Sequence, residues 1–292
     1  MHEISCLLDV RQTLAEGPLW DDRTGRLLWC DIAGQAIHSY DWESGERQSW
    51  QFPDAVGSFG LCDNGCFVVA RRKCVVLFDP VSGEETLVAE IETDNSRTRN
   101  NDGKVGPDGA FYLGTMDDVT PRQPIAALYR VTADGSVSKI TDSLTVSNGL
   151  AWSPDGRRLY HAETRPGFID VWDFDPLSGA ASNRRRLIDL NETIGLPDGA
   201  TIDAEGNYWS AGVSAGVVNC ISPEGRIIET VEMPVRTPTM PCFCGPDLDT
   251  LVVTSLQRKN EPELMARYPM SGSLFAFKPG VRGLPPYRFR TE

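Results

Sequence analysis

The chain has 292 residues, of which 40% are apolar and 24% are charged, a composition typical of a globular protein. It carries 28 Lys and Arg against 41 Asp and Glu, a formal net charge of −13, which argues against a nucleic acid or an anionic membrane surface as its main partner. No apolar run reaches the roughly 20 residues of a membrane-spanning helix. The N-terminal segment has neither a basic region nor a long apolar region, so we expect a cytoplasmic protein.

One pattern recurs six times along the chain. It consists of a short apolar strand, a turn that contains glycine, and a second apolar strand, followed by a further hairpin such as the one that turns at Ala133-Asp134-Gly135. The starts lie at 16, 57, 101, 148, 198 and 240, so they are 41, 44, 47, 50 and 42 residues apart. This period is typical of a four-stranded propeller blade, and no segment has sustained helical periodicity. We therefore predict an all-β, six-bladed β-propeller of four-stranded antiparallel blades.

The predicted blades account for residues 1–292 as a single domain. The first hairpins of the blades span residues 16–31, 57–69, 101–113, 148–160, 198–209 and 240–254. The apolar run at residues 4–8 is a candidate strand that completes the last blade, which would close the ring and cover an open edge.

The cysteines and histidines do not form a recognisable metal motif. The eight cysteines include Cys62-x-x-x-Cys66 and Cys242-x-Cys244, but no pair of C-x-x-C motifs, and the three histidines are scattered. We expect buried, reduced thiols and no disulfide framework. Any bound metal must then rely mainly on oxygen ligands.

Equivalent positions of the repeats form a ring around the central channel. When the repeats are aligned on their turn glycines, four of the six ring positions carry polar oxygen donors, although each of these residue types is also common in turns. Two buried carboxylates without partners would be costly, and a hard divalent cation is the partner that suits carboxylate and amide oxygens. The ring positions are Glu16, Gly57, Asn101, Asn148, Asp198 and Met240.

Two further polar features lie near this ring. Arg99 precedes Asn101 by two residues and could donate forked hydrogen bonds to the hydroxyl groups or carboxylate of a substrate; a surface arginine is the alternative. Asp117 and Asp118 follow the Gly-Thr-Met segment and either face the mouth of the channel or lie on a solvated loop.

Several short segments, in this order and spacing, resemble the senescence marker protein, regucalcin and gluconolactonase family of six-bladed lactonases. The resemblance implies that Glu16, Asn148 and Asp198 hold one divalent metal and that Asp198 also serves in acid–base chemistry. It implies that Arg99 and Asn101 contact the hydroxyl groups of the substrate. The segments are Ala15-Glu16-Gly17-Pro18, Arg99-Asn100-Asn101-Asp102-Gly103-Lys104, Gly114-Thr115-Met116, Ser147-Asn148-Gly149-Leu150-Ala151-Trp152-Ser153, Leu196-Pro197-Asp198-Gly199 and Pro241-Cys242-Phe243-Cys244-Gly245.

Departures from the family pattern concern substrate preference rather than the metal site. They are Asp117-Asp118-Val119 in place of a glutamate, Glu163 in place of an aspartate, and Cys244 in place of a glycine. Pentonolactones, hexonolactones and charged sugar lactones therefore all remain open as substrates. The metal remains open among calcium, zinc, manganese, magnesium and ferrous iron.

The sequence and the resemblance together predict hydrolysis of a sugar lactone to the open aldonic acid in carbohydrate catabolism. The metal would polarise the lactone carbonyl, and the proton of the attacking water would pass to Asp198 or to a hydroxide on the metal. Two alternatives remain: a non-catalytic propeller that binds calcium or a protein, and a metal-dependent esterase or phosphotriesterase. We expect a small-molecule substrate, no nucleic-acid or membrane partner, and a monomer or small homo-oligomer.

Overall fold

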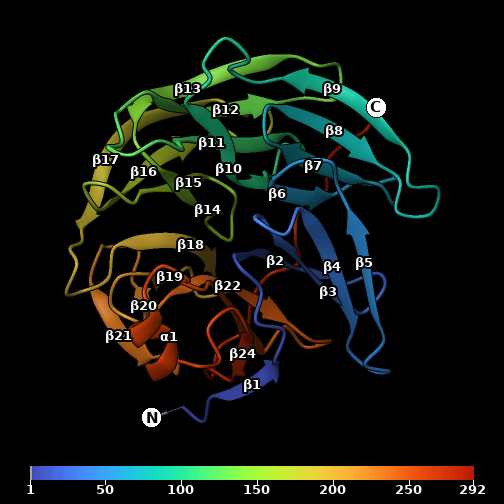
Figure 1. Ribbon diagram of the computed structural model, residues 1–292. Coiled ribbons are helices and arrows are strands. Elements are labelled where there is room, and N and C mark those ends of the chain that lie inside the picture. Colours follow the sequence, from blue (N-terminus) through green and yellow to red (C-terminus); the bar gives the residue numbers. More distant parts are fainter. Residues whose placement is uncertain (1) are drawn as a thin grey trace.

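The computed structural model describes residues 2–292 and contains six four-stranded antiparallel sheets around a central channel (Figure 1). This confirms the predicted six-bladed β-propeller. We number the blades along the chain, and in each blade the first strand in sequence lies innermost, except that the last blade also takes a strand from the N-terminus.

The strand bounds show the regularity of the repeat. Blade 1 comprises β2 (Ala15–Asp21), β3 (Arg26–Asp31), β4 (Ala36–Asp41) and β5 (Arg47–Gln51). Blade 2 comprises β6 (Val56–Leu61), β7 (Phe67–Arg71), β8 (Cys74–Phe78) and β9 (Glu85–Glu90). Blade 3 comprises β10 (Thr98–Val105), β11 (Phe111–Asp117), β12 (Ala126–Val131) and β13 (Val137–Leu144).

The second half of the chain repeats this order. Blade 4 comprises β14 (Ser147–Trp152), β15 (Arg158–Glu163), β16 (Phe168–Phe174) and β17 (Ala181–Asp189). Blade 5 comprises β18 (Pro197–Ile202), β19 (Tyr208–Gly212), β20 (Val217–Ile221) and β21 (Ile227–Glu232). Blade 6 comprises β22 (Pro238–Cys244), β23 (Thr250–Ser255), β24 (Leu274–Phe277) and the N-terminal strand β1 (Ser5–Leu8).

Strand β1 closes the ring. It pairs antiparallel with β24, with Ser5 opposite Ala276 and Cys6 opposite Phe275. The first and last strands of the chain therefore share one sheet, which covers the edge that β24 would otherwise expose. This confirms the prediction that residues 4–8 complete the last blade.

Apolar side chains from neighbouring blades interlock and hold the sheets face to face. Between blades 1 and 2, for example, Leu28 and Ile37 pack in one buried cluster with Phe59 and Val69. Burial of such side chains supplies about 1.5–3 kcal/mol each relative to exposure. All eight cysteines are free thiols, but only four are buried as predicted: Cys6 is exposed, and Cys66, Cys74 and Cys242 are half-buried.

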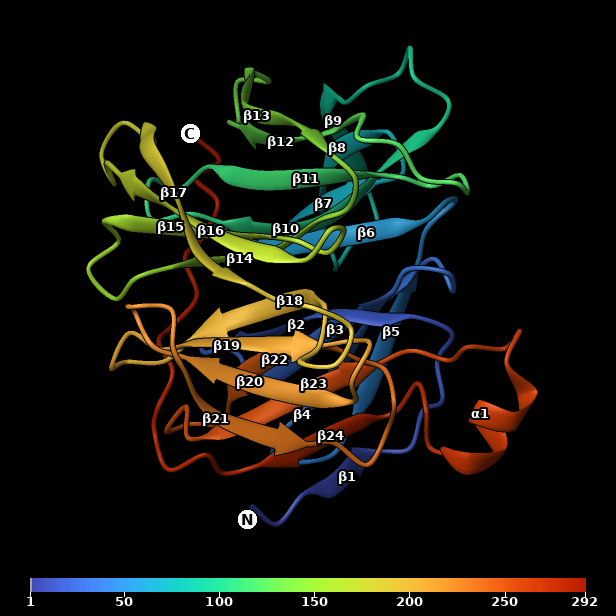
Figure 2. The same ribbon diagram turned by 90° about the vertical axis from the view of Figure 1, so that its left-hand side faces the viewer.

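The two mouths of the channel differ. At the front mouth, nearest the viewer in Figure 1, the β23–β24 connection carries the helix α1 (Pro262–Arg267). At the rear mouth the C-terminal segment crosses the channel, where the Phe289 N–H donates to the Leu61 carbonyl at 2.8 Å and the Arg290 N–H to that of Gly109 at 3.0 Å. Figure 2 shows the helix and the C-terminal segment on opposite sides of the molecule.

The helix was not predicted, because six residues are too few to give a periodic pattern. Within residues 2–292, no helix is both long and apolar enough to cross a membrane.

Candidate active site

The innermost strands are irregular where they pass the channel. Pairing of β2 with β3 shifts between Glu16 and Leu19, and equivalent shifts follow Asn148 in β14 and precede Ala200 in β18. Such a bulge disturbs the strict alternation of side chains, so neighbouring residues can face the same way. Every blade has this irregularity, and it brings polar side chains from several blades to the channel near the front mouth.

A chain of hydrogen bonds joins four of the predicted site residues. Arg99 Nη1 donates to Asn101 Oδ1 at 2.9 Å, and Asn101 Nδ2 donates to Asn148 Oδ1 at 2.8 Å. Asn148 Nδ2 then donates to Asp198 Oδ1 at 2.8 Å. The structure therefore brings together residues of blades 3, 4 and 5 that are up to 99 positions apart in the sequence.

Glu16 joins this group through its charge. It is buried, with 8% of its surface exposed, and its Oε2 accepts a hydrogen bond from the Gly17 N–H at 2.8 Å. Burial raises its pKa well above the ordinary value, and repulsion from Asp198 and Asp102 adds to the effect. Burial also raises the pKa of Asp198 to about 8, again with a contribution from Asp102.

These three carboxyl groups lack an adequate counter-charge. None of them forms an ion pair within residues 2–292. Burial raises the pKa of Asp102, and the Lys104 ammonium opposes this only in part, while Lys104 Nζ itself donates to the Ala200 carbonyl at 2.8 Å. A group of buried carboxyl groups without a matching cation fits a hard divalent metal ion.

The donor set for such an ion depends on an amide. No cluster of three or more His, Cys, Asp and Glu side chains suited to a metal occurs in residues 2–292. The oxygen of Asn148 would therefore have to complete a set with Glu16 and Asp198. In the present arrangement Asn148 turns its nitrogen toward Asp198, so binding would require the amide to rotate and present Oδ1.

The other two ring positions provide no donor. Gly57 is needed for packing, because a Cβ there would lie 2.6 Å from the Asn100 carbonyl oxygen. Met240 is buried and packs against Gly199. Both positions let the inner strands approach one another closely around the channel.

Arg99 is not a surface arginine. It is 8% exposed, and its Nε donates to Asp118 Oδ1 at 3.2 Å. Asp118 also accepts from Arg72 Nη2 at 3.0 Å, whereas Asp117 is buried and pairs with Arg97 at 2.7 Å. Asp118 thus lies at the mouth beside the site, while Asp117 holds its own loop.

Sequence reasoning missed Asp102, Lys104 and Thr164. Strict alternation would place Asp102 on the face opposite Asn101, but the pairing of β10 shifts between Asn100 and Gly103. The run of turn-forming residues within a predicted strand was the available signal for that bulge. Thr164 supports the site, because its Oγ1 accepts from Asn148 Nδ2 at 2.8 Å and donates to the Pro197 carbonyl at 2.7 Å.

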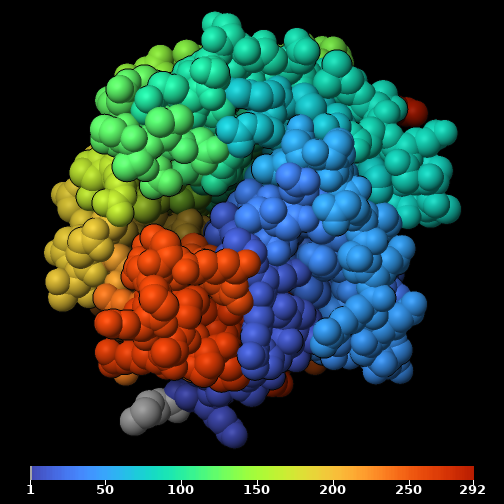
Figure 3. Space-filling view, viewed as in Figure 1, coloured from blue at the N-terminus to red at the C-terminus, as the bar shows by residue number. Residues whose placement is uncertain are grey.

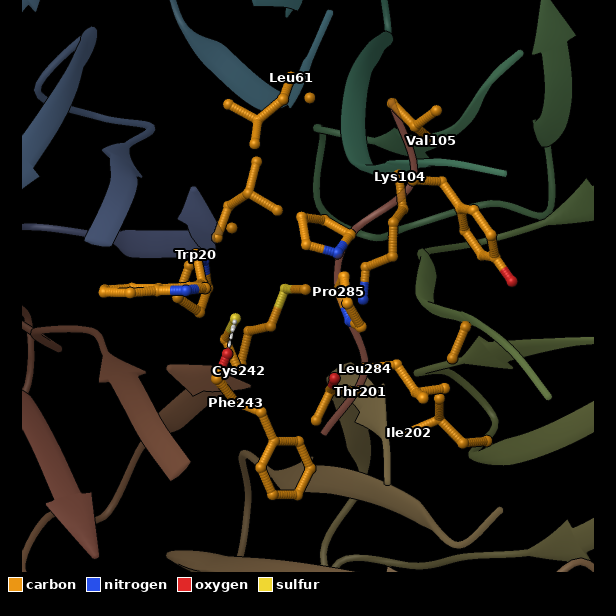
Figure 4. Close-up of a pocket in the computed structure, with 18 of the residues that line it drawn as sticks. Trp20, Leu61, Lys104, Val105, Thr201, Ile202, Cys242, Phe243, Leu284 and Pro285 are labelled. Atoms are coloured by element: carbon orange, nitrogen blue, oxygen red, sulfur yellow. Dashed lines mark hydrogen bonds between the residues drawn. The ribbon is translucent and has the colours of Figure 1, made fainter. Parts of the chain in front are cut away.

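A separate cavity lies deeper in the channel (Figure 4). Its walls include Trp20, Leu61 and Phe243, and residues 284–287 of the C-terminal segment line it from the rear. Lys104 reaches into it, but no carboxylate lines it. This cavity is mainly apolar and lies apart from the carboxyl groups near the front mouth.

Comparison with known proteins agrees with the fold. Residues 14–257 match the family model described as the SMP-30/gluconolactonase/LRE-like region. The chain belongs to this family, whose match covers all of blades 1 to 5 and the two inner strands of blade 6.

Relatives extend the match over nearly the whole chain. It is 34% identical to regucalcin of Xenopus laevis, over 98% of each chain. It is 35% identical to 6-deoxy-6-sulfogluconolactonase of Pseudomonas putida, over 96% of each chain. The crystal structure of a calcium-binding protein, regucalcin from Agrobacterium tumefaciens, superposes with a TM-score of 0.93 at 27% identity, covering 99% of this chain and 98% of that one.

Proposed function

We propose that this protein is a metal-dependent hydrolase that opens a sugar lactone to the aldonic acid. The observation that carries the proposal is the group of three carboxyl groups without a counter-cation, one of which, Asp198, is linked through Asn148 and Asn101 to the guanidinium of Arg99. A scaffold needs no such group, and its burial in one place is unfavourable for folding. The family membership and the lactonase among the relatives support the same reaction.

Glu16, Asn148 and Asp198 are the residues that would hold the divalent ion. When bound, the ion would supply electrophilic polarisation of the lactone carbonyl and stabilise negative charge on its oxygen. The carboxylates would hold it in their ionised forms, so protons would leave Glu16 and Asp198 as it binds.

Asp198 is the proposed general base. The oxygen of a water molecule bonds to the lactone carbonyl carbon while one water proton passes to the Asp198 carboxylate. The bond between the carbonyl carbon and the ring oxygen then breaks, and that oxygen takes the proton and becomes a hydroxyl group. The new carboxylic acid ionises, so each turnover releases one proton to solution.

Arg99 and Asn101 would orient the sugar. Nη1 and Nε of Arg99 are engaged with Asn101, the Asn100 carbonyl and Asp118, but Nη2 has no hydrogen-bond partner within residues 2–292. That nitrogen is a fixed donor beside the site, because the neighbouring bonds hold the guanidinium plane. It is suited to a hydroxyl or ring oxygen of the substrate.

The test is proton release from a panel of aldonolactones in weak buffer. Metal-stripped protein is assayed with and without added zinc, calcium, manganese, magnesium or ferrous iron, beside the variants Asp198→Ala and Glu43→Gln. We expect metal-dependent turnover of at least one lactone, abolished by Asp198→Ala and retained by Glu43→Gln, since Glu43 lies on an exposed turn. Turnover that survives in Asp198→Ala would reject the base assignment.

A calcium-binding protein without catalysis is the second candidate, and the description of the Agrobacterium relative favours it. The same assay separates the two. Bound metal with no acceleration of any lactone above its spontaneous hydrolysis would reject the enzyme and support the binding protein.

A further inference from the structure

The front mouth is bordered by two long connections from opposite blades. Residues 118–125 join β11 to β12 in blade 3, and residues 256–273 join β23 to β24 in blade 6. In Figure 3 the face is hollowed near its centre between the segments of these blades, coloured teal to green and orange, and the blue segments of blades 1 and 2. A substrate that reaches Asp198 from this side passes between them.

Positive charge gathers on the part of this rim beside Arg99. Four guanidinium groups lie here beside two acidic residues, Asp117 and Asp118. Asp118 accepts hydrogen bonds from two of them, and Asp117 pairs with a third. These four arginines and two aspartates therefore carry a formal charge of +2, although the whole chain carries −13. The four guanidinium groups belong to Arg72, Arg97, Arg99 and Arg122.

Arg122 is the least neutralised of the four. Its Nε donates to the Asp117 carbonyl at 3.0 Å, and no carboxylate lies within 4.0 Å of its guanidinium among residues 2–292. It is exposed in the middle of the 118–125 connection. Its remaining donors therefore face solvent at the mouth.

Arg72 and Arg122 lie within electrostatic reach of the site. Burial lowers the pKa of Arg99, and the positive charges of Arg72 and Arg122 lower it further. The Asp118 carboxylate acts in the opposite direction and raises the pKa. Arg99 in turn is linked by hydrogen bonds through Asn101 and Asn148 to the Asp198 carboxyl group, which we assign as the base. A continuous chain of hydrogen bonds therefore leads from the reaction centre through Arg99 and Asp118 to Arg72 at the rim.

We propose that the lactone carries a second, anionic group away from its ester, a carboxylate, sulfonate or phosphate, which Arg122 and Arg72 bind at the rim. This inference rests on the proposed lactonase function. Guanidinium groups suit planar or tetrahedral oxyanions because they donate two parallel hydrogen bonds. The rim also raises the local concentration of an anion at the mouth of an otherwise acidic protein.

Arg258 on the opposite rim is a weaker candidate. Its charge acts to lower the pKa of Asp198, behind the larger effects of burial, Asp102 and Arg99. However, its Nη1 is engaged with Glu261 at 3.3 Å. We therefore assign the anion to the blade 3 side.

The experiment compares D-glucono-1,5-lactone with its 6-phosphate and its 6-deoxy-6-sulfo counterpart, using metal-loaded protein. We expect kcat/KM for at least one anionic lactone to exceed that of the neutral lactone about tenfold or more, mainly through KM, at low salt. The ratio should fall toward one in 0.5 M sodium chloride, because added ions screen the rim.

Variants locate the anion. Arg122→Gln should lower the anionic-to-neutral ratio about tenfold, Arg122→Lys should restore part of it, and Arg47→Gln, an exposed arginine on β5, should leave it unchanged. A ratio at or below one in the unmodified protein, or a ratio unaffected by Arg122→Gln, overturns the proposal. A ratio that falls only in Arg258→Gln overturns the choice of residues. If no lactone is hydrolysed at all, the proposed function fails as well, whereas turnover with no preference for the anion removes this inference alone.

Discussion

Replacing Asp198 by Asn should stabilise the metal-free protein while abolishing turnover. The substitution removes a carboxyl group from beside Glu16 and Asp102 and keeps the shape of the side chain. It also keeps an oxygen that can accept the hydrogen bond from Asn148 Nδ2. Few substitutions at a polar buried position are expected to raise stability, so the sign of the effect is diagnostic.

The magnitude follows from the shifted pKa. The pKa of Asp198 rises from an ordinary 3.8 to about 8 in the folded protein, so at pH 7 folding requires a proton to bind. At 1.36 kcal/mol per pKa unit, the cost over the interval from 3.8 to 7 is at most about 4 kcal/mol. Asp198 is partly exposed, which reduces the expected gain to about 2–4 kcal/mol. For 292 residues this corresponds to a rise in Tm of roughly 3–6 °C.

The effect depends on pH with a definite sign. Below pH 3.8 the group is protonated in both the folded and the unfolded protein and makes no difference. Between 3.8 and about 8 the folded protein holds more protons than the unfolded chain, so stability of the metal-free protein falls as pH rises. The Asp198→Asn variant should show a flatter profile over the same range.

The assay is urea unfolding from pH 5 to 8 in the presence of a chelator, with Asp203→Asn as the matched control. Asp203 is a fully buried aspartate of the same blade, and its carboxylate accepts from two backbone N–H groups and from Trp209 Nε1. We expect that control to be destabilised by about 1–3 kcal/mol, because several donors lose their charged acceptor. A loss of stability in Asp198→Asn at pH 7 would refute the account of an uncompensated carboxylate.

Added metal should reverse the order of the two proteins. At free metal about 1,000-fold above its Kd, a site specific to the folded state adds about 4.1 kcal/mol, which exceeds the advantage of about 2–4 kcal/mol expected for the metal-free variant. The unmodified protein should gain this amount and Asp198→Asn should gain little, which titration calorimetry can confirm independently of activity.

Three further substitutions test other parts of the structure. Gly149→Ala should lower the free energy of unfolding by about 2 kcal/mol or more, measured by urea unfolding, because Gly149 has φ +62° and a Cβ would collide with the Tyr208 hydroxyl. An unchanged free energy would show that β14 can shift. Asn101→Ala should lower kcat/KM by about 10–100-fold with a small change in stability, since it cuts the link between Arg99 and Asn148; unchanged kinetics would remove Asn101 from the site. Deletion of residues 2–8 should expose the β24 edge and cause self-association, seen by light scattering, and a monodisperse, equally stable protein would contradict the role of β1 in closure.

The fold was predictable because its signals are local and repeated. Turn glycines such as Gly109 and Gly156 adopt φ of 78° and 67°, which other residues rarely do, so each marks a hairpin in the sequence. Six copies of that signal at intervals of 41 to 50 residues specify the blades. The closure by β1 was predictable for a related reason, since blade 6 lacked one strand and the N-terminus offered one.

The site was predictable only in part. Residues at the same phase of the repeat, such as Glu16 and Asn148, come together because the propeller has rotational symmetry. Asp102 could not be placed by phase, because a bulge changes the direction of side chains without changing the repeat length. The partners of Arg99 were also hidden, since Asp118 comes from another strand end and Arg72 from another blade.

The same bulges explain why the site lies at the inner strands. A regular β-strand would send alternate side chains into the packing between blades, where a carboxylate has no solvent and no partner. The irregular pairing after Glu16 and before Ala200 instead directs polar groups along the channel, at the end opposite the C-terminal segment. The apolar contacts between blades then supply the stability that the carboxyl groups reduce. Metal binding would then offset the electrostatic cost of the buried carboxyl groups, a cost that the fold already tolerates. We therefore expect the metal-free protein to remain folded and the metal to change its stability rather than its architecture.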